Sequence, residues 1–102
     1  MVDERYMLSI NELEYGNNKV KIENRFYVYI LRCADNTLYT GWTINLDSRV
    51  ARHNTGKGSK YTRSRLPVTL VYREECEDEK SARRRELAIK RLTRAEKLDL
   101  VA

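Results

Sequence analysis

The fold of this chain is decided by residues 26–43, which read Phe-Tyr-Val-Tyr-Ile-Leu-Arg-Cys-Ala-Asp-Asn-Thr-Leu-Tyr-Thr-Gly-Trp-Thr. Aromatic and β-branched residues dominate positions 26–33 and again positions 38–43, a composition typical of β-strands. The four residues between them, 34–37, have the character of a turn. The segment therefore predicts a β-hairpin.

The length of the hairpin loop decides which side chains share a face, because strand side chains alternate. A three-residue loop over 34–36, closed by Asn36 in the left-handed region, pairs Tyr29 with Gly41 and places Tyr29 and Tyr39 on one face. A two-residue loop would shift the pairing by one and separate the tyrosines. With the three-residue loop, the opposite face carries the side chains of Val28, Ile30, Leu38 and Trp42.

The next part of the chain predicts a helix, a loop and a third strand. Asn45 is a favourable cap for a short helix over residues 46–54. Residues 55–66 are rich in glycine and polar side chains and predict a loop, which Pro67 ends. A strand follows over residues 68–74.

Two helices are predicted after the third strand. Asp78 caps a helix that runs to about Leu92, and Thr93-Arg94-Ala95-Glu96 is a capping box that starts another. The order β-β-α-β-α-α predicts an α+β fold, a small three-stranded antiparallel sheet flanked by helices. A chain of 102 residues has room for one such domain, which we place at residues 26–102.

Residues 1–25 form an N-terminal extension with two interpretations. Leu8 and Ile10, then Val20 and Ile22, flank Gly16-Asn17-Asn18, a pattern that permits an accessory hairpin. A flexible leader is the alternative.

The charge, cysteine and histidine content narrow the classes of partner and cofactor. The net charge of +5 and the pI near 9.4 favour an anionic partner. Cys33 and Cys76 provide neither a disulfide framework nor zinc spacing, so we expect partly buried, reduced thiols. One histidine excludes a zinc or haem site built from imidazoles, so a metal would need carboxylate and water ligands, which favours Mg²⁺ or Mn²⁺. No apolar run spans a bilayer and no signal-peptide pattern is present, so the expected location is the cytoplasm.

Five residues have the chemistry that phosphodiester cleavage requires. Tyr29 and Tyr39 supply hydroxyls for proton transfer, and Arg49 supplies a guanidinium shaped for phosphate. His53 lies four residues after Arg49, so both stack along one side of the predicted helix. Glu86 lies at the edge of the apolar stripe of its helix, where a carboxylate needs a cation or a metal as its partner.

Each of these residues taken singly also has a structural interpretation. Tyrosines are common in half-buried strands, and an arginine or a histidine on a helix is often solvated. For Glu86 the structural alternative is an ion pair with a neighbouring Arg83 or Lys90. Their joint arrangement is what favours a function.

Val28-Tyr29-Ile30 and Tyr39-Thr40-Gly41 are two signatures that lie ten residues apart, counted from tyrosine to tyrosine. Together with residues 42–49, 53–54, 56–63 and 84–92, they resemble the GIY-YIG endonuclease superfamily, specifically its small stand-alone bacterial branch. The resemblance covers residues 26–102. It implies a metal-dependent endonuclease that hydrolyses phosphodiester bonds in DNA with little sequence specificity, in DNA repair or processing.

The resemblance also implies a role for each site residue. Tyr29 would be the general base and Tyr39 would support it, although which tyrosine is the base stays open. Arg49 would hold the scissile phosphate, and His53 would assist in proton transfer or phosphate contact. Glu86 would bind a single Mg²⁺ or Mn²⁺.

Basic residues around one tyrosine predict a nucleic-acid-binding surface, made of Arg52, Lys57, Lys60, Tyr61, Arg63 and Arg65. Such a group suits a phosphate backbone with occasional base stacking, and a solvated surface loop is the alternative. We expect DNA as the partner, with RNA as the alternative. Binding should be salt-sensitive, and a targeting protein would choose the site.

A second hypothesis is a nucleic-acid-binding module of the same fold that has lost useful catalysis. Several better-known members of the superfamily have an asparagine late in the domain that helps to bind phosphate. This chain has none after Asn54, and Lys90 is a candidate replacement.

Overall fold

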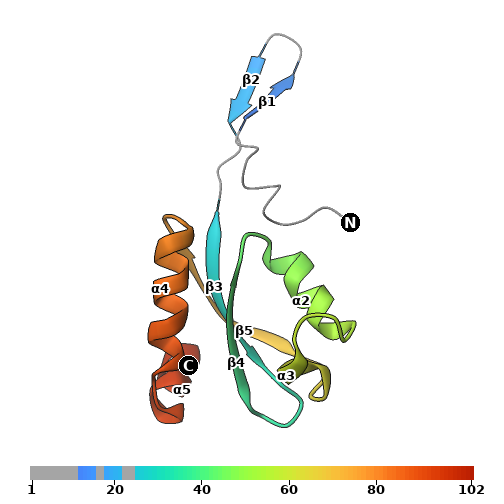
Figure 1. Cartoon of the computed structure of the whole chain (residues 1–102), viewed down its shortest axis with the longest axis vertical. Helices are drawn as coiled ribbons and strands as arrows, with labels where there is room; N and C mark the ends of the chain where they lie inside the picture. The colour runs from blue at the N-terminus through green and yellow to red at the C-terminus, as the bar shows by residue number, and fades with distance from the viewer. Residues whose placement is uncertain (1–11, 16–17, 22–24) are drawn as a thin grey trace.

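The computed structural model describes residues 12–15, 18–21 and 25–102. At its centre is an antiparallel sheet of the strands β3 (Phe26–Arg32), β4 (Leu38–Thr43) and β5 (Thr69–Cys76), in the order β4-β3-β5 (Figure 1). The first two strands form the predicted hairpin. The central strand β3 pairs with both neighbours, so its side chains are the most deeply covered.

Helices cover both faces of this sheet. One face carries α2 (Leu46–Asn54) and the short α3 (Lys60–Arg63), and the other carries α4 (Glu79–Lys90) and α5 (Arg94–Val101) (Figure 1). The predicted α+β fold and its element order are therefore confirmed. The addition is α3, a single turn inside the predicted loop, which the side chain of Ser59 caps by accepting the Thr62 N–H.

The hairpin has the register of a three-residue loop. Tyr29 pairs with Gly41 and Leu31 pairs with Tyr39, which places both tyrosines on one face. Asn36 adopts the left-handed conformation at φ 67°, and the Cys33 N–H donates to the Thr37 carbonyl at 2.9 Å. The predicted register is confirmed.

The face toward α4 and α5 is a dry apolar core. Phe26, Val28 and Ile30 of the central strand pack with Ala82 and Ile89 of α4, and all five side chains are buried. The predicted apolar face is therefore the one that α4 covers, and burying it contributes hydrophobic stabilisation. A second link joins α4 to β5, because the Arg85 Nε donates to the Glu74 carboxylate at 2.8 Å.

The face toward α2 and α3 mixes apolar and polar groups. Leu31, Leu46 and Val68 pack beside Tyr29, with Leu46 contributed by α2. At the end of α2, the Asn54 side chain pairs with the backbone of Val68: its Nδ2 donates to the carbonyl at 3.1 Å, and its Oδ1 accepts from the N–H at 2.8 Å. This two-point contact ties the end of α2 to the chain just before β5.

The predicted caps of the other helices are present. Asn45 caps α2 by accepting the Ser48 N–H at 3.1 Å, and Asp78 caps α4 by accepting the Ser81 N–H at 2.7 Å. The capping box at the start of α5 is complete. Cys33 and Cys76 are free thiols, with Cys33 buried and Cys76 half-buried, as expected.

The N-terminal extension contains a two-stranded antiparallel ribbon of β1 (Glu12–Tyr15) and β2 (Asn18–Lys21). These strands lie in the segment for which the sequence permits an accessory hairpin. Leu8, Ile10 and Ile22, which the sequence pattern assigns to its strands, lie outside the described residues, as do Gly16 and Asn17 of its predicted turn. In the part of the chain that the structure describes, no helix has the length and apolar character needed to cross a membrane.

Candidate active site

Three of the predicted residues meet between the sheet and α2. The Tyr29 hydroxyl lies 3.0 Å from Nε2 of His53, within hydrogen-bond distance. The Tyr39 ring centroid lies 5.1 Å from that of His53 and 6.5 Å from that of Tyr29. Tyr29 and His53 are each 1% exposed, whereas Tyr39 is only partly buried. The spatial convergence of both tyrosines with the histidine is thus found in the structure.

Two glycines allow these rings to lie so close to the backbone. A Cβ at Gly41 would stand 2.5 Å from the Tyr29 hydroxyl and 2.7 Å from its Cζ. A Cβ at Gly58 would collide with the His53 ring and would stand 2.7 Å from the His53 Cα. Both positions therefore need a residue without a side chain.

The other nitrogen of His53 is held by the loop after α2. Nδ1 lies 2.7 Å from the Thr62 hydroxyl, which lies 2.9 Å from the Ser59 hydroxyl. Thr62 is 0% exposed. Thr62 and Ser59 are absent from the residues that the sequence predicts for the site. The sequence signal that could have identified them is a serine suited to cap a helix, because a cap at Ser59 starts a turn that directs Thr62 inward.

His53 is kept neutral near pH 7 by its surroundings. Its pKa is lowered first by burial, and then by the positive charges of Arg49 and Arg52 on the same helix. Arg49 lies one helical turn before His53 on α2. A neutral imidazole carries one donor and one acceptor nitrogen, so it can link Tyr29 to Thr62.

Tyr61 of α3 lies over the outer side of Tyr39. Their rings stack with centroids 6.0 Å apart and an interplanar angle of 25°, and Tyr61 is 38% exposed. The Arg65 guanidinium lies 3.9 Å from the Tyr61 ring centroid and donates to the Asp35 carboxylate at 3.1 Å. Arg65 therefore fastens α3 to the hairpin turn, a structural role beside the predicted nucleic-acid contact.

Glu86 lies on α4, which packs against the opposite face of the sheet. Its side chain is 18% exposed, and its Oε1 lies 3.3 Å from the Lys90 Nζ. The ion pair with Lys90 is therefore present. One turn earlier on the same stripe, Arg83 lies over the Trp42 ring at 5.5 Å, which directs this stripe toward the edge strand β4.

The donor set near Glu86 limits what metal could be held. Among the described residues, no three His, Cys, Asp or Glu side chains gather into a ligand cluster. A single half-buried carboxylate nevertheless fits Mg²⁺, which is commonly bound through one or two carboxylates with water and substrate phosphate completing its shell. The residues present thus fit an ion that substrate helps to hold, with Lys90 as a competing cation.

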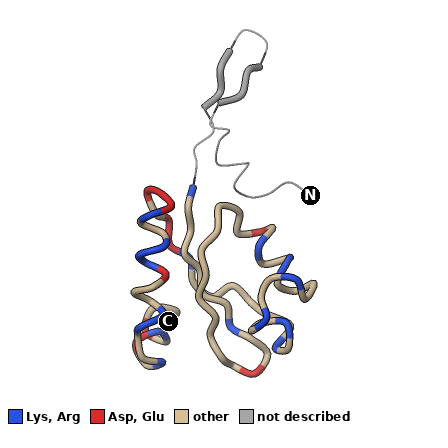
Figure 2. Tube along the Cα trace, in the orientation of Figure 1, with Lys and Arg blue, Asp and Glu red and all other residues tan. Residues whose placement is uncertain are grey.

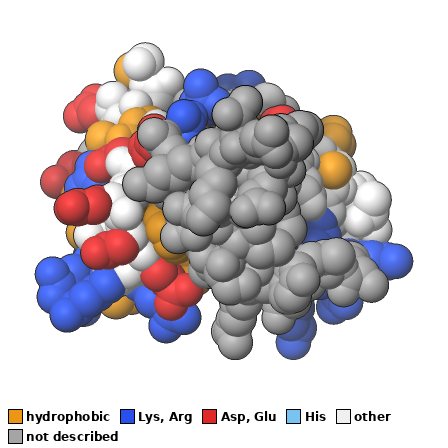
Figure 3. Space-filling model, turned by 90° about the horizontal axis from the view of Figure 1, so that it is seen from above, with side chains coloured by type: hydrophobic (Ala, Val, Ile, Leu, Met, Phe, Trp, Pro, Cys, Tyr) orange, Lys and Arg blue, Asp and Glu red, His pale blue; other side chains and the backbone are white. Residues whose placement is uncertain are grey.

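Positive charge is concentrated around the site face. Residues 46–68, from the start of α2 up to β5, carry six Lys and Arg but one acidic residue, Asp47, whereas α4 and α5 mix both signs (Figure 2). Seen from above, acidic and basic side chains lie next to one another on the side where Figure 1 places α4 (Figure 3). Four of the predicted nucleic-acid-binding residues are exposed basic side chains: Arg52, Lys57, Lys60 and Arg63.

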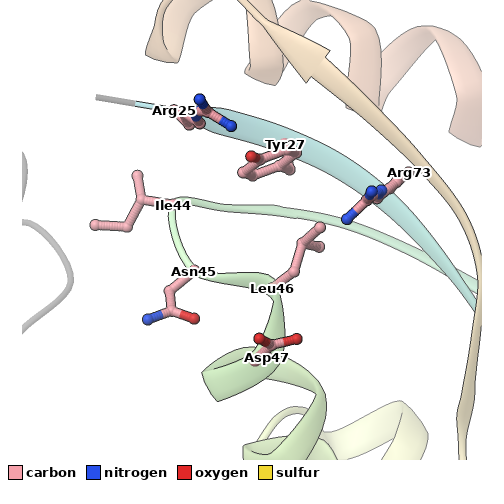
Figure 4. Close-up of a pocket in the computed structure, with 7 residues that line it drawn as sticks. All are labelled: Arg25, Tyr27, Ile44, Asn45, Leu46, Asp47 and Arg73. Atoms are coloured by element: carbon pink, nitrogen blue, oxygen red, sulfur yellow. The ribbon is translucent and has the colours of Figure 1, made fainter. Parts of the chain in front are cut away.

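A pocket of about 300 Å³ lies between β3, β5 and the start of α2 (Figure 4). Tyr27 and Arg73 point into it from the sheet, and Asp47 lies on its far side (Figure 4). Arg73 pairs with Tyr29 across the strands, so the pocket adjoins the tyrosine site. Asp47 and the Glu75 carboxylate, 3.8 Å from Arg25, balance the two arginines of the pocket. Its charge is therefore close to neutral.

The chain is similar to one family of known proteins over most of its length. The model of the GIY-YIG catalytic domain matches residues 25–99. A UPF0213 protein of Clostridium perfringens is 57% identical over 76 residues, which cover 74% of this chain and 82% of that protein. A UPF0213 protein of Staphylococcus haemolyticus is 51% identical, over 76% of this chain and 94% of that protein.

Two solved structures share the fold. The solution structure of UPF0213 protein BH0048 from Bacillus halodurans matches with a TM-score of 0.50 and 44% identity, over 76% of this chain and 82% of that chain. The protein EF2693 from E. faecalis matches with a TM-score of 0.52 and 38% identity, over 74% and 80%.

Proposed function

This chain belongs to the GIY-YIG family of nucleases, and from that premise we propose that it is a metal-dependent endonuclease that hydrolyses phosphodiester bonds in DNA with little sequence specificity. The observation that carries the proposal is the buried hydrogen bond between Tyr29 and His53, beside the Tyr39 ring. A buried and hydrogen-bonded pair of titratable side chains, in which burial lowers the pKa of the histidine, is a candidate for a functional site.

Tyr29 is the proposed general base. Its oxygen takes a proton from the attacking water as the water oxygen bonds to phosphorus and the leaving oxygen departs. A free phenol has a pKa near 10, so this role requires neighbours that favour the phenolate. The charge of Arg49 and a hydrogen bond from His53 are the groups available for this. Tyr39 supports Tyr29 from the partly exposed side of the site.

Arg49 is the proposed phosphate-binding residue, because its guanidinium can contact two phosphate oxygens at once. Glu86 is the residue that would hold Mg²⁺ or Mn²⁺, and the ion would supply positive charge to the phosphate.

The exposed cations Arg52, Lys57, Lys60 and Arg63 would contact the backbone of DNA, or of RNA as the alternative. Contacts with the backbone do not distinguish one base from another, so a partner protein would select the target, in DNA repair or processing. The free thiols suit the cytoplasm.

Purified protein incubated with supercoiled plasmid, with and without Mg²⁺ or Mn²⁺, tests the proposal. We expect metal-dependent nicking that falls by a factor of about 10²–10⁴ in Tyr29→Phe, the usual effect of removing a general base. Glu86→Ala should lose the metal-dependent activity. Equal traces of nicking in wild type and both variants would indicate contamination and contradict the proposal.

The ion pair between Glu86 and Lys90 favours one alternative, a nucleic-acid-binding module without catalysis. In that case the carboxylate serves the structure of α4 and holds no metal. Retained DNA binding without cleavage, in wild type and in Lys90→Gln, would support this alternative. Increased metal-dependent nicking in Lys90→Gln would instead show that the lysine competes with the metal.

A further inference from the structure

A continuous row of polar groups leads from the protein surface to the Tyr29 oxygen. It runs from the Ser59 hydroxyl to the Thr62 hydroxyl over 2.9 Å, on to Nδ1 of His53 over 2.7 Å, and from Nε2 to Tyr29 over 3.0 Å. Thr62 and His53 are buried, and Ser59 is partly exposed. Gly58 lets the loop pack directly on the imidazole.

The direction of these hydrogen bonds follows from the donors at the Ser59 end. The Ser59 Oγ already accepts the Thr62 N–H at 3.1 Å. If Ser59 donates to Thr62, and Thr62 donates to Nδ1, each hydroxyl uses its own proton, and His53 carries its proton on Nε2. In the reverse direction, Ser59 would accept both the N–H and the O–H of Thr62 with its two lone pairs, and its own proton would find no acceptor within the row. Within the described residues, the Thr62 hydroxyl has one other acceptor in reach, the Ser59 carbonyl, at the long distance of 3.5 Å.

We propose that Ser59 and Thr62 are positioning residues that select the Nε2–H tautomer of His53, so that His53 donates its hydrogen bond to the Tyr29 oxygen. This inference rests on the proposed function, because a donated hydrogen bond favours the phenolate that a general base needs. The aligned hydroxyls strengthen that bond, since hydrogen bonds in a chain polarise one another. The proton that Tyr29 gives up leaves to solvent, and His53 stays neutral throughout.

Other groups around the imidazole agree with a neutral donor. Arg49 and Arg52 on its own helix are both positive and disfavour a protonated ring. Tyr39 from β4 lies against its edge, and Thr62 from α3 contacts Nδ1. No carboxylate interacts with His53 among the described residues. While Tyr29 is a neutral phenol, the charges that act on the imidazole are therefore those of two cations, which disfavour its protonation.

The tautomer can be measured directly, because His53 is the only histidine of the chain. Long-range ¹H–¹⁵N correlation spectra of the full chain with ¹⁵N-labelled histidine give separate Nδ1 and Nε2 signals. We expect a protonated Nε2 and an unprotonated Nδ1 in wild type and in Thr62→Ser, which keeps the hydroxyl. Thr62→Val, nearly the same shape without the donor, should give a mixed or inverted tautomer. A wild type protonated on Nδ1, or an unchanged tautomer in Thr62→Val, would overturn the inference.

The rate of plasmid nicking against pH gives the second readout. Loss of an orienting partner of a functional histidine commonly costs about 10–100-fold, so Thr62→Val should lose that much near pH 7 and recover as pH rises, with Thr62→Ser close to wild type. A uniform loss at every pH would contradict the positioning role. Thr62→Ala, which removes the same hydroxyl with a smaller side chain, provides the same comparison in case Thr62→Val does not fold. If the wild type shows the expected tautomer but does not nick plasmid, the proposed function is contradicted and the inference about the tautomer stands.

Discussion

On the face of the sheet covered by α4 and α5, the fully buried side chains are those of Val28, Ile30 and Ile89, whereas on the face covered by α2 and α3 they include Tyr29, His53 and Thr62. The first set is apolar and needs only close packing. The second set is polar and is satisfied by mutual hydrogen bonds at 2.7–3.0 Å. The difference teaches that the first face is stabilised by apolar packing, and that the second also holds buried polar groups because their hydrogen bonds are made.

The largest effect is expected from Ile89→Ala on the apolar face. Truncating a fully buried isoleucine should lower the free energy of unfolding by about 2–5 kcal/mol, because it leaves a cavity in the core. Urea denaturation measures the loss. Leu87→Ala, on the same helix but 51% exposed, is the matched control and should stay within about 0.5 kcal/mol of wild type. A large loss of nicking by folded Ile89→Ala would show that the apolar face also affects activity, which would contradict this division between the two faces.

Gly41→Ala should have the next largest effect, on activity. The added methyl group must displace the Tyr29 hydroxyl from His53, and a misplacement of about 1 Å can cost about 100-fold in rate. Plasmid nicking measures the rate, and thermal melting shows whether the variant is folded. In a Tyr29→Phe background the same change should cost less stability, because the nearest clashing atom is gone. Full activity in Gly41→Ala would show that plasmid nicking does not depend on the contact between Tyr29 and His53.

A smaller effect is expected in the pH dependence of stability. The pKa of His53 is lowered in the folded state, so protonation favours the unfolded chain. The stabilisation is complete above the unfolded pKa of about 6.5 and is lost as pH falls toward the folded pKa. Urea denaturation at pH 5 to 8 should therefore show stability rising with pH, and His53→Gln should remove this rise. The same slope in His53→Gln would assign it to another group.

The smallest effect is expected from Lys60→Gln, an exposed cation beside the polar face. If Lys60 contacts a phosphate, the slope of log K against log salt should fall by about 0.9 on duplex DNA. Lys80→Gln, an exposed lysine on α4, is the control and should leave the slope unchanged. Fluorescence anisotropy at several salt concentrations measures both. Equal losses in the two variants would mean that charge alone, and not the face, determines binding.

The hairpin register and α2 were predictable because they depend on local rules. Strand alternation and the preference of Asn36 for the left-handed region place Tyr29 beside Tyr39, and the cap at Asn45 sets the start of α2. His53 is only one turn from Arg49 on that helix. These three steps required no knowledge of distant contacts.

The contact between His53 and Thr62 was not predictable in the same way. The loop between them can take many paths, and its path is fixed by Gly58 against the imidazole and by Arg65 against Asp35 across the chain. The partner of Glu86 was narrowed to two neighbours by helix geometry, and the structure selects Lys90. Whether the Glu86 carboxylate binds a metal depends on the substrate, and rules about local sequence say nothing of the substrate.

The amide of Asn54 has a consequence that reaches beyond its contact with Val68. Its nitrogen and oxygen each match one backbone group of opposite polarity. Aspartate has nearly the same outline, yet it would set an oxygen against the Val68 carbonyl, so an exchange of one atom turns an attraction into a repulsion. The tether that holds the histidine-bearing helix in place therefore depends on the amide itself, and Asn54→Asp would weaken it while leaving the size and shape of the side chain almost unchanged.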